Sequence, residues 1–421
     1  MGITHLRIRP GASLHPERSL STGTGSLGES FPSGSGWPAL MMCGLRVCGD
    51  TRSVVLRRCV ATLAAVAGCA FGVAVPAAAA TAAPGTAQAI PRGLVPTATS
   101  WVSPRSGIVL AYTALSAGAR PYLFFTGNAG RTWRSVPAPP VPFPADNTEP
   151  VATWADGVIA VTDGTHVVAT GDGGHHWSAV RLAGASHVSG ITLAITHWRM
   201  FALVQTQSGG TGSETVYSGP LRSGVLHPVR GLTVTGSIAY GDITTAGVLQ
   251  VDLGDDFTAQ RYWYSRDGVR FVSAALPCPD TTRALLGGER AGRVIALCSG
   301  TPSSVGPGED QKQVWIAGRL GGTFRPSGPV FVSPNEEGFA AASAQVMAVA
   351  TIFTVSATFN AGQTWTDEIT EPNGAFWTSL SFQSATTGVV VGTTVNNALQ
   401  SVGYVFRTTD AGHSWHALSL P

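Results

Sequence analysis

The octet TTDAGHSW at residues 408–415 decides the fold, because near copies of it recur along the chain. Three close copies and two degenerate ones precede it: TGNAGRTW (126–133), TGDGGHHW (170–177), TFNAGQTW (358–365), SRDGVRF (265–271) and AGRLGGTF (317–324). A motif that returns every few tens of residues is the signature of a repeat architecture. We therefore expect one supersecondary unit, repeated along the chain.

Each copy has the composition of a hairpin turn between two strands. An apolar run precedes it, such as YVFR before Thr408, and a shorter run follows, such as HALSL after Trp415. The Asp or Asn side chain can accept hydrogen bonds from its own turn, and the Gly tolerates a positive φ. The closing aromatic ring can pack on a neighbouring sheet. We interpret the octet as a structural staple made of these positions: Thr126, Asn128, Gly130, Trp133, Thr170, Asp172, Gly174, Trp177, Ser265, Asp267, Phe271, Gly321, Phe324, Thr358, Asn360, Gly362, Trp365, Thr408, Asp410, Gly412 and Trp415.

The octets resemble the Asp-box, or BNR, repeats of sialidase-like β-propellers over residues 95–421. The last unit, which runs from SLSFQSATTGVVVGTT to YVFRTTDAGHSW, is also similar to propellers of the photosystem II stability and assembly factor type. The resemblance implies an all-β fold of four-stranded antiparallel blades around a central axis. It also implies that the Asp-box lies at the blade rim, away from any active site.

The spacing of the closing aromatics predicts the number of blades. From Trp133 to Trp415 the intervals are 44, 94, 53, 41 and 50 residues. The interval between Trp177 and Phe271 is about twice the others, so we expect one unit there that lacks the octet. This gives a seven-bladed β-propeller, with blades of the usual length for four strands. A six-bladed propeller is the alternative, if the boxless stretch is an insertion.

The sequence before the repeats has the features of an export signal. Residues 1–40 are rich in Gly, Ser and Pro and are interpreted as a disordered or non-native upstream extension. Residues 41–83 read as a signal peptide, with arginines, the apolar run CVATLAAVAGCAFGVAV and a small-residue cleavage zone. Residues 84–96 are assigned as a linker and residues 97–421 as the Asp-box β-propeller. We expect a secreted or cell-envelope protein of bacterial origin.

Cysteines bear on both membrane attachment and redox state. VAGC, which ends at Cys69, resembles a bacterial lipobox, and membrane association is expected only if Cys69 is lipidated. Only Cys278 and Cys298 follow the predicted signal peptide. In an exported chain this pair favours a disulfide between the loop before one unit's inner strand and its second strand. Two free buried thiols are the alternative.

Composition argues against several classes of partner. The formal net charge is +2 and charged residues make up 12% of the chain, so we expect no nucleic-acid partner. We find no pattern typical of a metal site or a cofactor site, and we expect neither. His175 and His176 occupy the variable positions of one octet, and His166, His187 and His197 lack ligand spacing.

A sialidase-like exo-glycoside hydrolase is the enzymatic alternative. That chemistry needs an arginine cluster, a Tyr–Glu pair and an acidic Asp on the central face. The sequence LVPTATSWVSPRSG lacks the Arg-x-Pro segment of that family, and the scattered arginines are explained more simply by solvation: Arg105, Arg181, Arg261 and Arg293. Five tryptophans outside the octets are interpreted as packing residues: Trp154, Trp198, Trp263, Trp315 and Trp377.

We therefore expect an exported, monomeric and non-catalytic propeller that acts as a binding scaffold for a protein or glycan. Loops carry function on such scaffolds, while strands carry packing. The longest candidate loops of the central face are GARP near Arg120, QSGGTGSE around Gly210 and GTPSSVGPGEDQKQ around Gly308. An assembly factor of the photosystem II stability type is a further alternative.

Overall fold

The computed structural model describes residues 93–144, 151–155, 157–196, 198–208, 211–236, 239–244, 249–255, 261–278, 283–290, 292–300, 309–334, 336–370, 375–395 and 401–421. All regular secondary structure in these ranges is β-strand, which confirms the all-β prediction. Within them no helix is long and apolar enough to cross a membrane. The predicted upstream extension and signal peptide lie outside the described residues. The first strand begins at Val95, inside the stretch assigned as a linker.

The described strands fall into consecutive groups of four, which we number as units 1 to 7. Unit 1 contains β1 (Val95–Trp101), β2 (Gly107–Tyr112), β3 (Pro121–Thr126) and β4 (Arg134–Val136). Unit 2 contains β5 (Val151–Ala155), β6 (Val158–Thr162), β7 (Val167–Thr170) and β8 (Ser178–Leu182). Unit 3 contains β9 (Val188–Ile195), β10 (Arg199–Ser208), β11 (Thr211–Pro220) and β12 (Val225–Gly236).

Unit 4 contains β13 (Ala239–Thr244), β14 (Leu249–Asp255), β15 (Arg261–Ser265) and β16 (Val272–Ala275). Unit 5 contains β17 (Arg283–Arg290), β18 (Arg293–Ser299), β19 (Glu309–Ala317) and β20 (Phe324–Pro334). Unit 6 contains β21 (Glu336–Ala341), β22 (Met347–Thr351), β23 (Thr354–Thr358) and β24 (Thr366–Thr370). Unit 7 contains β25 (Phe376–Phe382), β26 (Gly388–Val395), β27 (Ser401–Thr408) and β28 (His416–Ala417).

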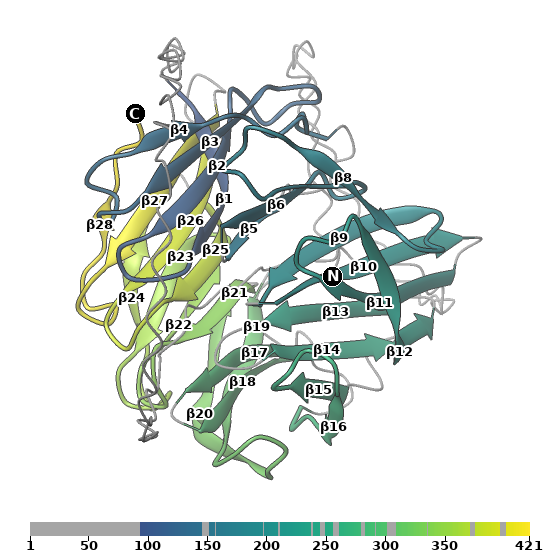
Figure 1. Ribbon diagram of the computed structural model, residues 1–421. Coiled ribbons are helices and arrows are strands. Elements are labelled where there is room, and N and C mark those ends of the chain that lie inside the picture. The colour runs from purple at the N-terminus through teal and green to yellow at the C-terminus, as the bar shows by residue number, and fades with distance from the viewer. Residues whose placement is uncertain are drawn as a thin grey trace, which may run out of the picture.

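The units are arranged radially, as in a β-propeller (Figure 1). Within each unit the strands pair antiparallel in chain order. The first strand of every unit contacts the first strand of the next, from β1 through β5, β9, β13, β17 and β21 to β25, and β25 contacts β1. Four-stranded antiparallel sheets around such a ring are the propeller architecture.

Units 2 and 3 are joined more closely than the other pairs. The outer strands β8 and β12 pair parallel through Arg181 with Val225 and Leu182 with Leu226, so the two units form one eight-stranded sheet. Backbone bonds from Arg181 N to Gly224 O (2.9 Å) and from Ala183 N to Leu226 O (2.8 Å) extend this pairing. Unit 3 is the stretch that lacks the octet in the sequence.

Apolar side chains fill the space between every pair of adjacent units. One cluster joins units 1 and 2 through residues such as Leu110 and Val161, and corresponding clusters join each later pair. A further cluster, with Trp101 of unit 1 and Val391 of unit 7, closes the ring. All residues of β2 are buried, because neighbouring units cover both of its faces.

The two ends of the described chain meet at this closing interface. Leu418, just after β28, donates its backbone N–H to Val405 O at 2.7 Å and packs beside Trp101. A recess of about 240 Å³ separates residues 93, 94 and 96 from residues 418–421. The described strands begin with the inner strand of unit 1 and end with the outer strand of unit 7.

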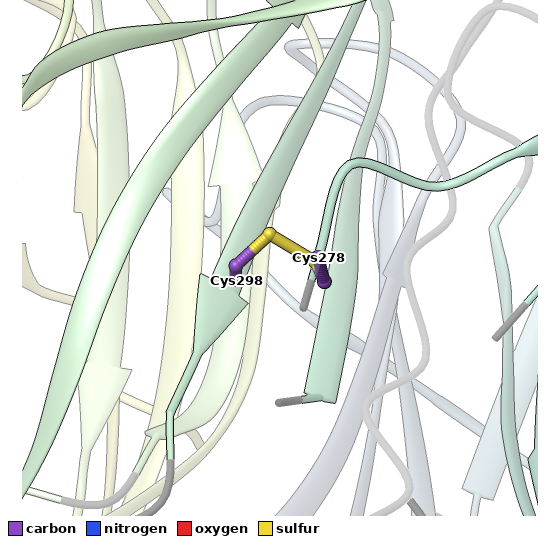
Figure 2. The surroundings of a disulfide bond; sticks show 2 residues. All are labelled: Cys278 and Cys298. Carbon is purple, nitrogen blue, oxygen red and sulfur yellow. A yellow bond between two sulfur atoms is a disulfide. The ribbon is translucent and has the colours of Figure 1, made fainter. Parts of the chain in front are cut away.

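A disulfide joins Cys278 to Cys298, which confirms the predicted bond (Figure 2). Cys278 follows β16 and precedes the inner strand of unit 5, and Cys298 lies in β18, the second strand of that unit. The Cα atoms are 5.3 Å apart. The bond therefore fixes the connection between units 4 and 5.

Candidate functional site

The four close copies of the octet form the same hydrogen-bonded turn. In unit 7, Thr408 Oγ1 accepts from Gly412 N (2.8 Å) and donates to Asp410 Oδ1 (2.7 Å), which also accepts from Ser414 N (2.9 Å). The turns at 126–133, 170–177 and 358–365 have the same three bonds at 2.7–3.1 Å. The hydroxyl and the Asp or Asn side chain thus satisfy backbone groups of their own turn.

The aspartates of these turns are held in their ionised form. The Ser414 and Thr408 hydroxyls lower the pKa of Asp410 to about 2. The backbone N–H and imidazole of His176 lower the pKa of Asp172 below its usual range. Donors to a carboxylate favour the charged form, and a general acid must instead be protonated at working pH. The geometry therefore assigns these aspartates to the turn.

The glycines of the octets lie against the unit that precedes their own. A Cβ added to Gly174 would lie 2.8 Å from Pro137 O of unit 1, and one added to Gly362 would lie 3.0 Å from Ser327 O of unit 5. A Cβ at Gly130 would lie 2.8 Å from Leu418, across the closing interface. The glycines of the four close copies, Gly130, Gly174, Gly362 and Gly412, also have a positive φ, between 81° and 98°. The glycine thus serves the contact between units as well as the turn, a role that the octet pattern alone does not indicate.

The residue before that glycine also has a positive φ. Ala129, Ala361 and Ala411 have φ of 68°, 60° and 65°. Their backbone N–H groups bind carbonyls of the turn between the first two strands of their own unit, for example Ala361 N to Gln345 O at 2.9 Å. This bond accounts for a backbone conformation that a non-glycine residue rarely adopts.

The closing aromatic rings pack between strands and units. Trp365 stacks on Phe331 of unit 5 with ring centroids 4.4 Å apart, and Trp133 meets Trp101 edge-on at 6.2 Å. Phe271 contacts Phe201 of unit 3 at 6.4 Å, and Phe324 contacts Tyr262 of unit 4 at 6.0 Å. Trp415 meets Phe382 and Trp177 Nε1 donates to Pro137 O.

The two degenerate copies use different bonds. Asp267 Oδ1 accepts from Val269 N (2.9 Å) and Arg270 N (2.8 Å), and these donors lower the pKa of Asp267. Gly321 N donates to the hydroxyl of Tyr262 of unit 4 at 3.0 Å, and this hydroxyl takes the place of the threonine hydroxyl that Ala317 lacks.

The remaining residues weighed for chemistry are spread over the surface of the molecule. Arg105, Arg181, Arg261 and Arg293 are exposed on four different units. His176 Nδ1 lies 2.6 Å from Asp172 Oδ2, and the imidazole is exposed. No group of three or more metal-ligating side chains occurs in the part of the chain that the structure describes. His197, Gly210 and Gly308 lie outside it.

The tryptophans outside the octets pack as interpreted, with one exception. Trp377 is fully buried, and Trp154 meets Phe125 edge-on at 5.2 Å. Trp263 and Trp315 are partly buried beside neighbouring clusters. Trp198 is 67% exposed, so its interpretation as a packing residue is wrong. It lies in the turn between β9 and β10 of unit 3, where no octet supplies a packing surface.

The stretch QSGGTGSE, expected to be a loop, is mostly β-strand. Residues 199–208 and 211–220 pair without interruption from Arg199↔Pro220 to Ser208↔Thr211. Threonine favours strands, and hydroxyls directly opposite each other form cross-strand bonds. The hairpin therefore continues beyond Val204, the last residue of β10 that belongs to an apolar cluster. It extends toward the end of unit 3 where β9 begins and where β10 turns into β11.

One face of this hairpin and of the adjoining β12 carries a row of hydroxyl groups, which we call the hydroxyl face. The alternation of strands places its members on one side of the sheet: Thr206, Ser208, Thr211, Ser213, Thr215, Thr233 and Thr235. Thr206 and Ser213 hydroxyls lie 2.8 Å apart, and Thr215 Oγ1 donates to Thr233 Oγ1 at 3.2 Å. Among these residues Ser208, Thr211, Thr233 and Thr235 are exposed.

The opposite face of the same hairpin is polar, and it carries a buried acid. Gly190, Gln205 and Glu214 are directly opposite one another on β9, β10 and β11. Glu214 is 1% exposed, and the absence of a side chain at Gly190 leaves room for Gln205. The carboxylate thus lies between units 3 and 4, beside an otherwise apolar cluster.

Comparisons with known proteins give distant likenesses only. No protein-family model matches the chain, and no curated protein matches it. A Niastella koreensis GH74 enzyme is similar with 14% identity and a TM-score of 0.32, over 77% of this chain and 54% of that one. The β-propeller domain of the Trilobed protease from Pyrococcus furiosus is similar with 9% identity and a TM-score of 0.45, over 78% of this chain and 99% of that one. Trypanosoma rangeli sialidase is similar with 12% identity and a TM-score of 0.36, over 75% of this chain and 54% of that one. This chain therefore spans about half the length of the GH74 enzyme and of the sialidase.

Proposed function

We propose that this protein is an exported, seven-bladed Asp-box propeller that binds a protein or glycan partner through the hydroxyl face of unit 3. Seven groups of four strands within the described residues, joined by a core cluster at every junction, support the blade number. The shared bonds of the four octet turns support their assignment as Asp-boxes. The disulfide between Cys278 and Cys298 agrees with export, because such bonds persist in oxidising compartments.

The observation that carries the proposal is the extension of unit 3 with hydroxyls on one face. Strands β10 and β11 pair over ten residues each, whereas β2 and β3 have six. The hydroxyls beyond Val204 lie outside the apolar clusters, so they are not needed to fill the core between units. A rigid, regularly spaced row of groups that both donate and accept hydrogen bonds suits recognition of a polar partner.

The test removes the hydroxyls without changing the shape of the strands. The secreted chain is screened against immobilised polysaccharides and against envelope proteins by photocrosslinking from Ser208. The triple variant Thr211→Val, Thr233→Val and Thr235→Val keeps β-branched side chains, so the fold should be retained. We expect partner affinity to fall by about tenfold or more, as three net hydrogen bonds are lost.

A matched control is available on another unit. Thr366 is an exposed threonine on β24 and bonds to Glu368 at 2.6 Å. Thr366→Val should leave partner affinity unchanged. Equal affinity of the triple variant and the wild type would overturn the assignment of the hydroxyl face. Turnover of a fluorogenic sialoside by the purified chain would replace the binding scaffold with the hydrolase alternative.

A further inference from the structure

The end of unit 3 that lies farthest along the strands from the hydroxyl face differs from the corresponding end of units 2 and 4. Between β11 and β12 the octet is replaced by the short turn Leu221-Arg222-Ser223-Gly224, in which Leu221 N donates to Trp198 O at 2.9 Å. Trp198 has the largest exposed fraction among the exposed large apolar residues that the structure describes. Trp198 directly precedes β10, and the nine residue steps from Arg199 to Ser208 amount to about 30 Å along that strand.

Arginines of units 3 and 4 surround this turn, and a turn of unit 2 lies beside them. A Cβ at Gly171, in the octet turn of unit 2, would lie 3.9 Å from Arg222 Cζ. A Cβ at Gly268, in the turn of unit 4, would lie 3.1 Å from Arg199 Cδ. Arg199 follows Trp198 directly, and its Nε donates to Ser218 Oγ at 2.9 Å, which fixes the direction of the guanidinium. The turns of units 2, 3 and 4 therefore form one continuous surface around Trp198.

This surface, which we call the Trp198 rim, is predominantly cationic. Its arginines are Arg199, Arg222, Arg266 and Arg270, of which the last three are exposed. Its acids are Asp172 and Asp267, and both carboxylates accept hydrogen bonds from their own turns. The guanidinium groups of Arg222, Arg266 and Arg270 take part in no ion pair with these acids.

We propose that the Trp198 rim is a binding site for an acidic polysaccharide. The C–H groups on one face of a pyranose ring can stack on the electron-rich face of an exposed indole. A carboxylate or sulfate on the same or the next sugar can pair with the planar guanidinium of Arg222 or Arg199. The single aromatic and the spaced cations thus match a polymer that alternates flat apolar faces with negative groups.

A protein partner fits this surface less well. Stable protein interfaces have an apolar centre from which charged groups are depleted. Here the neighbours of Trp198 are polar turns, and Val269 is the only other large apolar residue exposed among the described residues of those turns. The proposal is independent of the proposed function, because the hydroxyl face lies at the other end of the unit.

The experiment measures affinity of the full secreted chain by calorimetry for four probes. Polygalacturonate carries carboxylates on pyranose rings, dextran sulfate carries sulfates, pullulan is neutral and polyglutamate carries charge without sugar. We expect binding of polygalacturonate or dextran sulfate that weakens as salt rises and screens the charges. Trp198→Ala should weaken this binding about tenfold, and Arg222→Gln should weaken it about threefold.

Matched variants separate the site from general effects. Phe353 is 50% exposed in the turn between β22 and β23, so Phe353→Ala removes an exposed aromatic elsewhere and should leave affinity unchanged. The triple valine variant of the hydroxyl face should also bind the acidic polymer normally. Because Trp198 and Arg222 are exposed, their variants should unfold at the wild-type temperature.

Four outcomes would overturn the proposal. Absence of binding to both acidic polysaccharides would remove the site. Equal affinity for polyglutamate would show that charge alone is recognised and would point to an acidic protein. Equal affinity for pullulan would remove the role of the arginines. An unchanged affinity in Trp198→Ala would show that the polymer binds elsewhere.

Discussion

Replacement of Thr408 by valine tests whether the octet turn stabilises the fold as its bonds indicate. Thr408 is fully buried, and valine has nearly the same shape without the hydroxyl. The change leaves the backbone N–H of Gly412 buried without its acceptor, 2.8 Å away in the wild type, and removes a donor to Asp410. An unsatisfied buried donor costs about 1–3 kcal/mol, so we expect a loss of about 2–3 kcal/mol in the free energy of unfolding.

Equilibrium unfolding in guanidinium chloride measures this loss, with Thr408→Ser as the matched control. Serine keeps the hydroxyl and loses one methyl group, so its cost should be about 1 kcal/mol. Replacement of Thr126, Thr170 or Thr358 by valine should cost about as much as Thr408→Val, because the hydrogen bond from the glycine N–H to the threonine hydroxyl is 2.9–3.0 Å long in those turns. A valine variant as stable as the serine variant would refute the reasoning, since the hydroxyl would then contribute nothing.

Three further predictions concern the same framework. Replacing both Cys278 and Cys298 by alanine should lower the free energy of unfolding by about 3 kcal/mol, from the entropy of a closed loop with a separation of 20 residues, and dithiothreitol should destabilise only the wild type. Gly362→Ala should lower the free energy of unfolding by about 1–3 kcal/mol, because φ is 85° and Ser327 O blocks the Cβ. Ala361→Gly should change it by less than about 1 kcal/mol. Thermal unfolding that ranks the two variants in the opposite order would contradict the contact of Gly362 with Ser327. The pKa of Asp410 is lowered to about 2 in the folded chain, so the stabilisation by its carboxylate should be complete above the unfolded pKa of about 4 and disappear as the pH falls toward 2. Unfolding measured across this pH range should show a smaller acid-induced loss of stability in Asp410→Asn than in the wild type. Identical pH profiles of the two proteins would exclude a stabilising role of the Asp410 carboxylate.

The sequence was sufficient for the parts of the fold that depend on local bonds. All three recurrent bonds of the octet turn connect residues two to four positions apart, so the motif itself contains them. The disulfide was predictable for a similar reason, because only two cysteines follow the predicted signal peptide. The boxless unit was predictable from the doubled interval between Trp177 and Phe271.

Contacts between units were not predictable, because no local pattern contains them. The position of Gly174 against Pro137 and the parallel pairing of Arg181 with Val225 join residues far apart in the chain. The extended hairpin was missed because Gly and Ser in QSGGTGSE are typical of loops, while the opposing hydroxyls that stabilise it lie on the partner strand. The exposure of Trp198 was not predictable, because the sequence near this residue does not show whether another turn of the folded unit covers its ring.

The loss of the octet in unit 3 and its two candidate surfaces have a common structural cause. In other units the octet turn packs on the preceding unit, and that contact fixes the conformation of the turn. Unit 3 is instead joined to unit 2 by hydrogen bonds of β8 with β12 and with Gly224, the last residue of the turn, and Leu221 packs in the apolar cluster between these two units. The turn Leu221-Arg222-Ser223-Gly224 therefore contacts unit 2 without an octet, and Trp198 and Arg222 remain exposed beside it. The same outer strand, at twelve residues, supports the lengthened β10–β11 hairpin at the other end, so that one change in how two units are joined permits a distinct surface at each end of the sheet.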